Sequence, residues 1–214
     1  MKRTRVLLAD DHRVVAEGLR GLLEPYFDVV GIVGDGRELL AAAKQLDPDV
    51  VVLDISMPSL NGIEAARQMR AANSRAKVIV LTMHREVTYA ARSLEAGACG
   101  FVLKHAAASE LVTAIQEALK GGTYISPQIA GDVLKASRRG VSPGVVELLG
   151  ELTPRQREVL QLVAEGRSAK EIAALLRISR RTAEFHKARL MEALGIHNTA
   201  ELIQYAIRTG VTSG

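Results

Sequence analysis

The sequence predicts two domains, a doubly wound α/β domain followed by a small all-α domain. Short apolar runs alternate with segments of helical spacing from the N-terminus to residue 122. After residue 150 the spacing is helical only, and the excess of positive charge lies in this second part of the chain. At 214 residues the chain is long enough for each domain to bury its own core.

The first domain is expected to contain a five-stranded parallel sheet. Its apolar runs lack polar alternation, which is typical of strands buried on both faces. They occupy residues 5–9, 28–33, 49–54, 77–82 and 99–104. Apolar residues at helical spacing predict helices over residues 13–24, 36–46, 62–72, 86–97 and 108–122. Right-handed crossovers then favour the flavodoxin-like strand order 2-1-3-4-5, with a ligand crevice at the carboxyl ends of strands 1 and 3.

The two domains are expected to be joined by a linker over residues 122–147. The run RRGVSPG (138–144) is polar, basic and contains Gly and Pro, as linkers often do. One helix is expected inside this segment, near residues 127–136. The α/β domain then covers residues 1–121 and the helical domain covers residues 148–214.

The second domain is expected to contain four short helices, because its capping signals are clear. The segments LTPRQ, SAKE and NTAE match the capping box, in which a capping side chain is followed three residues later by Glu or Gln. Ser179 is expected to cap the third helix, and only the residues RIS separate the second helix from the third. Helix ends are expected at Gly166, Gly195 and Gly210.

The net charge of +4 is unevenly distributed. Residues 1–136 carry 16 basic and 16 acidic side chains, whereas residues 137–214 carry 12 and 8. A neutral domain joined to a small basic domain suggests an input module coupled to a nucleic-acid-binding module. No apolar run reaches the ~20 residues of a membrane span, and the apolar start of the chain stops at two aspartates. We therefore expect a cytoplasmic protein without a membrane partner.

Cys99 is the only cysteine, which rules out an internal disulfide and a CxxC metal or redox pair. We expect it to be a small buried hydrophobe, as free cysteines usually are.

Polar side chains follow four of the five predicted strands, at the carboxyl end of each. They are Asp10 and Asp11 after the first strand, Asp54 at the third, Thr82 at the fourth and Lys104 at the fifth. Carboxylates that lie close together repel one another unless a cation joins them, and such oxygen-rich clusters suit Mg²⁺. Asp54 would then stay ionised and attack a phosphoryl group to give an aspartyl phosphate, with Lys104 and Mg²⁺ offsetting the charge of the transferred group.

Two other interpretations compete with a phosphoacceptor site. Asp10 and Asp54 are each explained, taken singly, as helix or turn caps, with Lys104 as a surface charge. Five polar groups at the ends of four strands make that explanation improbable. A mononucleotide site is disfavoured because no Gly-rich phosphate loop follows the first strand.

Four segments of the first domain resemble the receiver domain of two-component response regulators. They are LLADDH (7–12), VVLDISMPSLNGIEA (51–65), VLTMH (80–84) and AGACGFVLKHA (96–106). The resemblance implies that Asp54 accepts a phosphoryl group from a sensor histidine kinase. It also implies a Mg²⁺ ion held by Asp11, Asp54 and the carbonyl of Ser56, with Asp10 acting largely through water.

The same resemblance assigns roles around the pocket. Thr82 would move to the phosphoryl oxygens, and Phe101 matches the aromatic side chain that responds to this movement. Ser56 and His84, two residues beyond Asp54 and Thr82, would tune the lifetime of the phosphoryl group. Gly62 is expected to supply a backbone conformation that other residues resist.

One position departs from the receiver pattern. Many receivers have a proline after the lysine of the fifth strand, usually with a cis peptide bond, whereas this chain has His105. The isomer of the bond between Lys104 and His105 is therefore left open.

The third helix of the second domain is expected to enter DNA. At 100° per residue, Ala183, Leu190 and Leu194 share a face that should pack on the core. The opposite face carries arginines, a glutamate, a small alanine and an exposed aromatic ring, side chains that can read base edges and thymine methyls. The candidate DNA contacts are Lys170, Arg180, Arg181, Thr182, Glu184, Phe185, His186, Lys187, Ala188 and Arg189. Taken alone, a charged helix face is more often only solvated.

Residues 152–208 resemble the LuxR-type helix-turn-helix domain of the NarL/FixJ response regulators. The segments that carry this likeness are LTPRQREVLQLVAEGRSAKEIAALLRIS, RTAEFHKARLMEALG and NTAELIQYAI. The resemblance implies binding of double-stranded DNA as a homodimer through the last helix, around residues 201–208, with RNA polymerase as a further partner.

Together these features predict a transcription regulator whose DNA binding is controlled by phosphorylation of Asp54. A phosphoryl-transfer enzyme is the second class considered, but no substrate pocket beyond Asp54 is visible in the sequence, so we expect no enzyme. In the remaining alternative the pocket is not used as a switch, and DNA binding is constitutive or controlled by a protein partner.

Overall fold

The computed structural model describes residues 3–138 and 152–212. The chain divides into two compact units, Met1–Val141 and Ser142–Gly214. Among the helices that the structure describes, none combines the length and apolar character of a membrane span.

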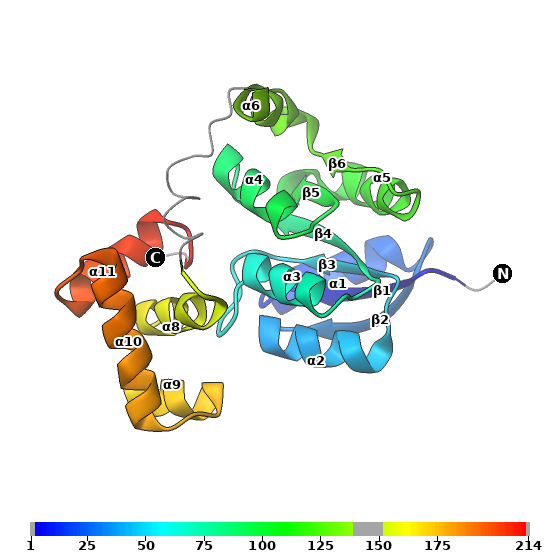
Figure 1. Ribbon diagram of the computed structural model, residues 1–214. Helices are drawn as coiled ribbons and strands as arrows, with labels where there is room; N and C mark the ends of the chain where they lie inside the picture. The colour runs from blue at the N-terminus through cyan, green and yellow to red at the C-terminus, as the bar shows by residue number, and fades with distance from the viewer. Residues whose placement is uncertain (1–2, 139–151, 213–214) are drawn as a thin grey trace. The chain divides into compact units, whose positions relative to one another are not determined.

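The first unit is built on a parallel sheet with the order β2-β1-β3-β4-β5-β6 in the described residues (Figure 1). The strands are β1 (Arg5–Ala9), β2 (Asp28–Val33), β3 (Val50–Leu53), β4 (Lys77–Thr82), β5 (Gly100–Leu103) and β6 (Tyr124–Ile125). The first five strands take the predicted order. Because Ala9 pairs with Leu53 and Thr82 pairs with Leu103, the carboxyl ends of these strands meet at one edge.

The sixth strand is a correction to the predicted five. Tyr124 and Ile125 pair in parallel with Gly100 and Phe101 of β5. Two residues are too few to show a strand period, and the flanking Gly and Pro indicated only a turn. The strand lies inside the segment expected to be a linker, as does helix α6 (Pro127–Arg138). Part of the expected linker therefore packs on the first unit, and residues 139–147 lie outside the described residues.

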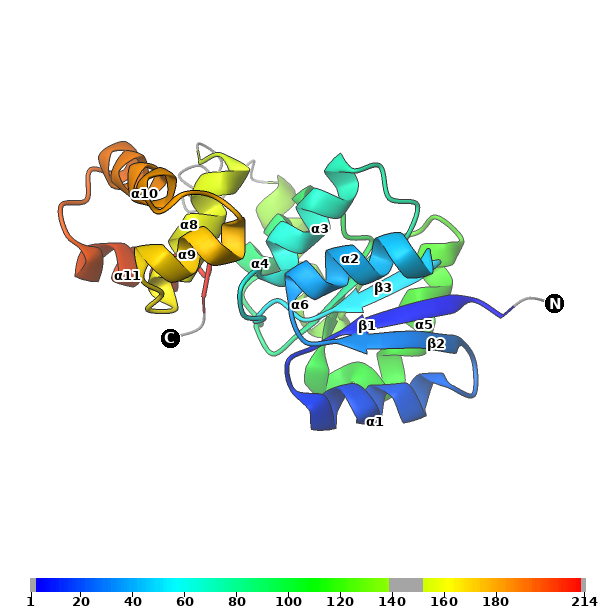
Figure 2. The same cartoon turned by 90° about the horizontal axis from the view of Figure 1, so that it is seen from below.

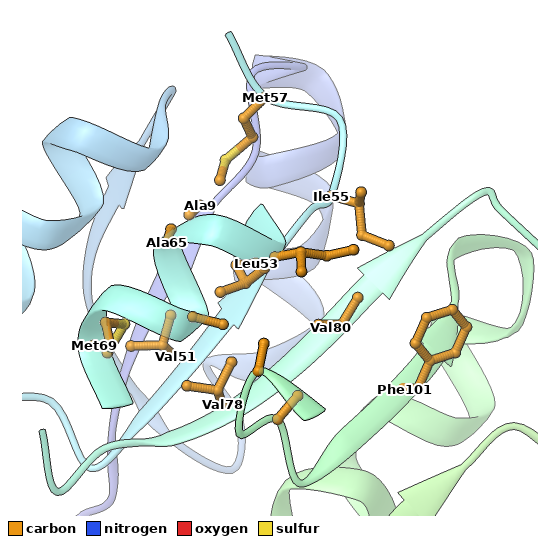
Figure 3. Close-up of a cluster of buried hydrophobic side chains, with 14 of the residues drawn as sticks. Ala9, Val51, Leu53, Ile55, Met57, Ala65, Met69, Val78, Val80 and Phe101 are labelled. Atoms are coloured by element: carbon orange, nitrogen blue, oxygen red, sulfur yellow. The ribbon is translucent and has the colours of Figure 1, made fainter. Parts of the chain in front are cut away.

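Helices cover both faces of the sheet (Figure 2). They are α1 (Arg13–Leu23), α2 (Gly36–Leu46), α3 (Gly62–Ala71), α4 (Val87–Glu95) and α5 (Ala107–Leu119), with the short 3-10 helix η1 (Lys104–Ala106) before α5. One core cluster joins the sheet to α2, α3, α4 and α6, and the other joins it to α1 and α5. Figure 3 shows part of the first cluster, in which Leu53, Val80 and Phe101 come from three neighbouring strands. These two cores hold the strand ends, and thus the polar edge, in a fixed register.

The second unit is helical and begins as its capping signals predict. Its helices in the described residues are α8 (Pro154–Ala164), α9 (Ala169–Leu176), α10 (Arg180–Leu194) and α11 (Thr199–Arg208). Capping boxes start α8 at Thr153 and α9 at Ser168, and the Ser179 side chain caps α10. Asn198 caps α11, but the Glu201 carboxylate accepts from the Asn198 side-chain Nδ2 and from the backbone of His197 rather than from the Asn198 backbone N–H.

A small core holds these four helices together. It includes Leu160, Leu190 and Leu202, each fully buried and each from a different helix. Burial of the Leu190 face turns the opposite face of α10 to solvent, which is the face expected to meet DNA.

Candidate functional site

The carboxyl edge of the sheet brings three of the predicted site residues into direct contact. Lys104 Nζ lies 2.7 Å from Asp10 Oδ2 and 2.9 Å from Asp54 Oδ2. Asp10 and Asp54 follow the paired ends of β1 and β3, and Lys104 follows β5. The side chains of Asp10 and Asp54 are buried, with exposed fractions of 3% and 4%, and that of Lys104 is 10% exposed. One ammonium group thus faces two buried carboxylates.

Neither carboxylate caps a helix in the part of the chain that the structure describes. His12 is the N-cap residue of α1, and Asn61 caps α3 through its side chain. Asp10 Oδ1 accepts from the backbone of His12, and Asp54 Oδ1 accepts from the backbone of Ile55 at 2.7 Å. The second bond fixes the rotamer of Asp54 and leaves its other oxygen toward Lys104.

The electrostatics of the pocket favour a bound cation. Burial raises the pKa of the Asp54 carboxyl, and the charge of Asp10 adds to this, whereas Lys104 and the Ile55 N–H oppose it. Burial lowers the pKa of Lys104, but its contacts with Asp10 and Asp54 outweigh this and raise it. With both carboxylates ionised, the single ammonium of Lys104 offsets only one of their two negative charges, and a divalent cation would offset the remainder.

The residues fit a hard divalent cation. Ligand atoms of Asp10, Asp11, His12 and Asp54 all lie within 4.8 Å of one another. Three of these side chains offer carboxylate oxygens, the donors that Mg²⁺ prefers. The carbonyl of Ser56, in the loop after β3, remains a predicted fourth ligand.

His12 was not singled out from the sequence. Its Nδ1 lies 2.9 Å from Asp11 Oδ1 and 3.4 Å from Asp10 Oδ1. The side chain is 64% exposed, so it contacts the cluster from the solvent side. The run Asp10-Asp11-His12 was the only sequence signal for this contact.

Two further candidates lie deeper in the fold. Thr82 is fully buried at the end of β4, and its Oγ1 accepts from the backbone of His84 at 3.2 Å. Phe101 is fully buried in β5, where it pairs with Val80 on one side and Ile125 on the other. The ring is therefore part of the core, two strands away from the strand that ends at Asp54.

Ser56 and His84 contact each other directly. Ser56 Oγ lies 3.0 Å from His84 Nε2, across the two loops that follow β3 and β4. The His84 ring also stacks on Tyr89 of α4, with 4.2 Å between ring centroids and 18° between ring planes. Sequence reasoning missed Tyr89, because four residues of loop and helix separate it from His84 without a motif.

Gly62 is required for a reason other than the expected one. Its backbone lies in α3 and is not left-handed, whereas Ser59 in the same loop has φ 65°. A Cβ at Gly62 would lie 2.0 Å from the carbonyl oxygen of Asp54 and 2.4 Å from Leu53 Cδ1. Glycine is thus needed because α3 begins against the backbone of the phosphoacceptor candidate.

The bond between Lys104 and His105 is trans, since the described residues contain no cis peptide bond. Lys104 begins the η1 turn, which leads directly into α5.

The predicted DNA-contacting face of α10 is solvent-exposed. Ala183 and Leu190 are buried, while Phe185 on the other face is 57% exposed. Arg189 is paired with Glu192 at 2.9 Å, and its guanidinium lies 6.0 Å from the centre of the Phe185 ring. These contacts hold an arginine and an aromatic side chain side by side on the surface.

The remaining candidates differ in their side-chain partners and in their exposure. Arg180 pairs with Glu184 at 2.9 Å, and Lys187 Nζ lies 2.8 Å from Thr199 Oγ1 of α11. Such surface pairs are weak and exchange readily for other partners. Lys170, Arg181 and Ala188 are exposed, whereas Thr182 and His186 are half-buried.

Comparison with known proteins agrees with both halves of the structure. The family model for the response regulator receiver domain matches residues 6–116, and that for bacterial regulatory proteins of the luxR family matches residues 150–206. The chain therefore belongs to the two-component response regulators that join a receiver domain to a LuxR-type DNA-binding domain.

Individual relatives match over nearly the whole chain. The transcriptional regulatory protein MctR of Rhizobium johnstonii is 40% identical over 213 residues, which is 99% of this chain and 96% of MctR. A structure of the response regulator RcsB of Salmonella typhimurium is 30% identical, covers 99% of this chain and 100% of that chain, and has a TM-score of 0.63. An RcsB–DNA complex is also 30% identical, covers 95% and 98% of the two chains, and has a TM-score of 0.57.

Proposed function

We propose that Asp54 is the phosphoacceptor through which a sensor histidine kinase controls this regulator. The observation that carries the proposal is the contact of one ammonium, Lys104, with the carboxylates of Asp10 and Asp54 at 2.7 and 2.9 Å. A structural ion pair needs one carboxylate, whereas a site for a phosphoryl group needs a nucleophile with cationic groups around it.

The reaction is a transfer between two nucleophiles. An oxygen of Asp54 attacks the phosphorus of the kinase phosphohistidine, the P–N bond breaks, and the imidazole leaves as the mixed anhydride forms on Asp54. Lys104 stays beside the new phosphoryl oxygens and offsets their charge. Mg²⁺, the cofactor that we propose for Asp10, Asp11, Asp54 and the Ser56 carbonyl, would supply further positive charge at these oxygens when bound.

The proposed response of the domain runs through Thr82 and Phe101. The Thr82 hydroxyl lies at the same sheet edge and would exchange its bond with the His84 backbone for one with a phosphoryl oxygen. Since Phe101 lies in the core beside β4, movement at Thr82 changes the space available to its ring. Phosphorylation would thus shift the populations of two packed states of the receiver.

We propose that the lifetime of the phosphoryl group on Asp54 depends on Ser56 and His84. These side chains are joined at 3.0 Å across the loops beside Asp54. A joined pair restricts the approach of the water that hydrolyses the acyl phosphate, so it slows the return to the unphosphorylated state.

The output that we propose is binding of double-stranded DNA by a homodimer, which then acts on RNA polymerase. Arg189, Glu184 and Phe185 are proposed to contact base edges, with Ala188 allowing close approach. The side chains proposed to contact phosphates or support the helix are Lys170, Arg180, Arg181, Thr182, His186 and Lys187. The RcsB–DNA complex supports this output, and DNA as the target favours the cytoplasm.

Phosphorylation of the intact protein tests the proposal. Wild type and Asp54→Ala are incubated with a small-molecule phosphodonor and Mg²⁺, and the product is analysed by intact mass and by acid and base lability. Wild type should gain one labile phosphoryl group and Asp54→Ala none. A wild-type protein that gains none, or a variant that gains one equally, would contradict the assignment.

A further inference from the structure

His84 is held on three sides in the loop between β4 and α4. Its backbone N–H donates to Thr82 Oγ1 at 3.2 Å, and its Nε2 lies 3.0 Å from Ser56 Oγ. Its ring lies almost parallel to that of Tyr89, 4.2 Å away. Only one of these restraints, the stack with Tyr89, comes from a helix.

Tyr89 is itself firmly placed. It lies in the first turn of α4, where its N–H bonds to the Glu86 carbonyl at 3.0 Å and its carbonyl accepts from Ser93 Oγ at 2.7 Å. Its half-buried ring packs against the core cluster on the α3 and α4 face of the sheet. The ring can therefore act as a fixed platform for a more mobile neighbour.

The stack determines which atoms of His84 are available. With Nε2 engaged by Ser56, that nitrogen is not free to accept a hydrogen bond from a water molecule. The other ring nitrogen, Nδ1, lies 3.9 Å from the Glu86 carboxylate, on the side away from Ser56. In this orientation the ring nitrogen that faces the loop after Asp54 is occupied by Ser56, so the imidazole is not set to act as a base toward water there.

We propose that Tyr89 is a positioning residue that holds the His84 imidazole against Ser56 and thereby prolongs the life of the phosphoryl group on Asp54. This inference rests on the proposed function of Asp54. It assigns a role to a side chain that acts only through the ring of His84.

The chain offers a matched set of variants. Tyr89→Phe keeps the ring and loses only the hydroxyl, so it should behave as wild type. Tyr89→Leu and Tyr89→Met keep an apolar side chain in α4 but remove the stack. Both should shorten the phosphoryl lifetime about fivefold, the equivalent of about 1 kcal/mol, which is the scale of an aromatic pair.

Two measurements distinguish the positioning of the His84 ring by Tyr89 from a general loosening of the receiver domain. The first is the NMR chemical shift of the His84 ring protons in the unphosphorylated protein, which are assigned by their loss in His84→Ala. An aromatic ring at position 89 should shift these protons in wild type and Tyr89→Phe only. In the His84→Ala background, Tyr89→Leu should change the decay rate no further. The inference would be overturned if the phosphoryl group decayed at the wild-type rate or more slowly in Tyr89→Leu and Tyr89→Met. It would also be overturned if Tyr89→Leu accelerated decay as much in the His84→Ala background as in the wild-type background.

Failure of the inference is distinguishable from failure of the proposed function. If wild type forms no acyl phosphate, the function assigned to Asp54 is wrong. If wild type forms it and the ring-free variants lose it at the wild-type rate, only the role of Tyr89 is wrong.

Discussion

Lys104 Nζ lies 2.9 Å from Oδ2 of Asp54, which joins the residue after β5 to the residue after β3. The exposed fractions of the two side chains are 10% and 4%, so little water screens the contact. The same ammonium lies 2.7 Å from Asp10. The ammonium group of Lys104 therefore offsets the negative charge of the carboxylates at the site of proposed phosphorylation.

Replacing Lys104 should slow phosphorylation. Lys104→Met removes the cation beside the oxygens on which charge develops, and we expect the rate with a small phosphodonor to fall about 100-fold. The control is Lys120→Met, because Lys120 pairs with Glu117 at 2.8 Å on an exposed surface. Both rates are measured by stopping the reaction at a series of times and determining the phosphorylated fraction by intact mass. Equal rates for Lys104→Met and wild type would remove Lys104 from the reaction.

The charge on Asp54 should cost stability in the metal-free protein. Because the native pKa of Asp54 is raised above its unfolded value, ionisation favours the unfolded state. Native stability should therefore fall as pH rises through the raised native pKa, and be greater below it. Asp54→Asn removes this loss and should raise the free energy of unfolding by about 1 kcal/mol at neutral pH.

Urea unfolding with a chelator present, from acidic to neutral pH, measures this difference. The gap between Asp54→Asn and wild type should widen with increasing pH and close again when Mg²⁺ is added. A gap that is constant with pH would show that ionisation of Asp54 is not its cause. Unfolding is best followed by circular dichroism, since the chain has no tryptophan.

Gly62→Ala should destabilise the receiver through a clash with the backbone. The added Cβ would lie 2.0 Å from the Asp54 carbonyl oxygen, so α3 or the loop must move, at a cost of about 1–3 kcal/mol. Gly18→Ala is the matched control, because Gly18 is an exposed position of helix α1 with nothing within 4 Å of a new Cβ. That variant should be stabilised by about 0.5–1 kcal/mol. Equal thermal midpoints for the two variants would contradict the steric explanation.

Arg189 and Lys170 should affect DNA binding in different ways. Arg189→Ala should cost about 1–3 kcal/mol on the specific site and relax its sequence preference, because Arg189 is proposed to read a base. Lys170→Ala should weaken binding to all sequences alike and reduce its salt dependence. Fluorescence anisotropy with specific and scrambled duplexes at several salt concentrations measures both effects. An unchanged preference in Arg189→Ala would reject its role in base reading.

The sheet and its polar edge were predictable because both follow from local pattern. Strands β1, β2 and β4 match the apolar runs at 5–9, 28–33 and 77–82 residue for residue. In a parallel sheet the carboxyl ends must meet at one edge, so the placement of Asp54 and Lys104 at the same edge follows from the strand order. The helix starts in the second unit were predictable for a similar reason, since a cap is a local hydrogen bond.

The remaining features depend on tertiary packing that leaves no periodic signal. Strand β6 has two residues, and only its pairing with β5 identifies it. The requirement for Gly62 arises from the approach of α3 to β3, not from its own backbone angles. The stack of His84 on Tyr89 depends on two side-chain rotamers across a loop, which residue spacing does not determine.

Control of DNA binding by Asp54 is tested most directly by the DNA affinity of the full-length protein with and without phosphorylation. Wild type and Asp54→Ala are each titrated with target DNA in Mg²⁺, with and without a small-molecule phosphodonor. We expect the donor to change the affinity of wild type and to leave that of Asp54→Ala unchanged. Equal affinity of wild type with and without the donor, at confirmed phosphorylation of Asp54, would contradict it.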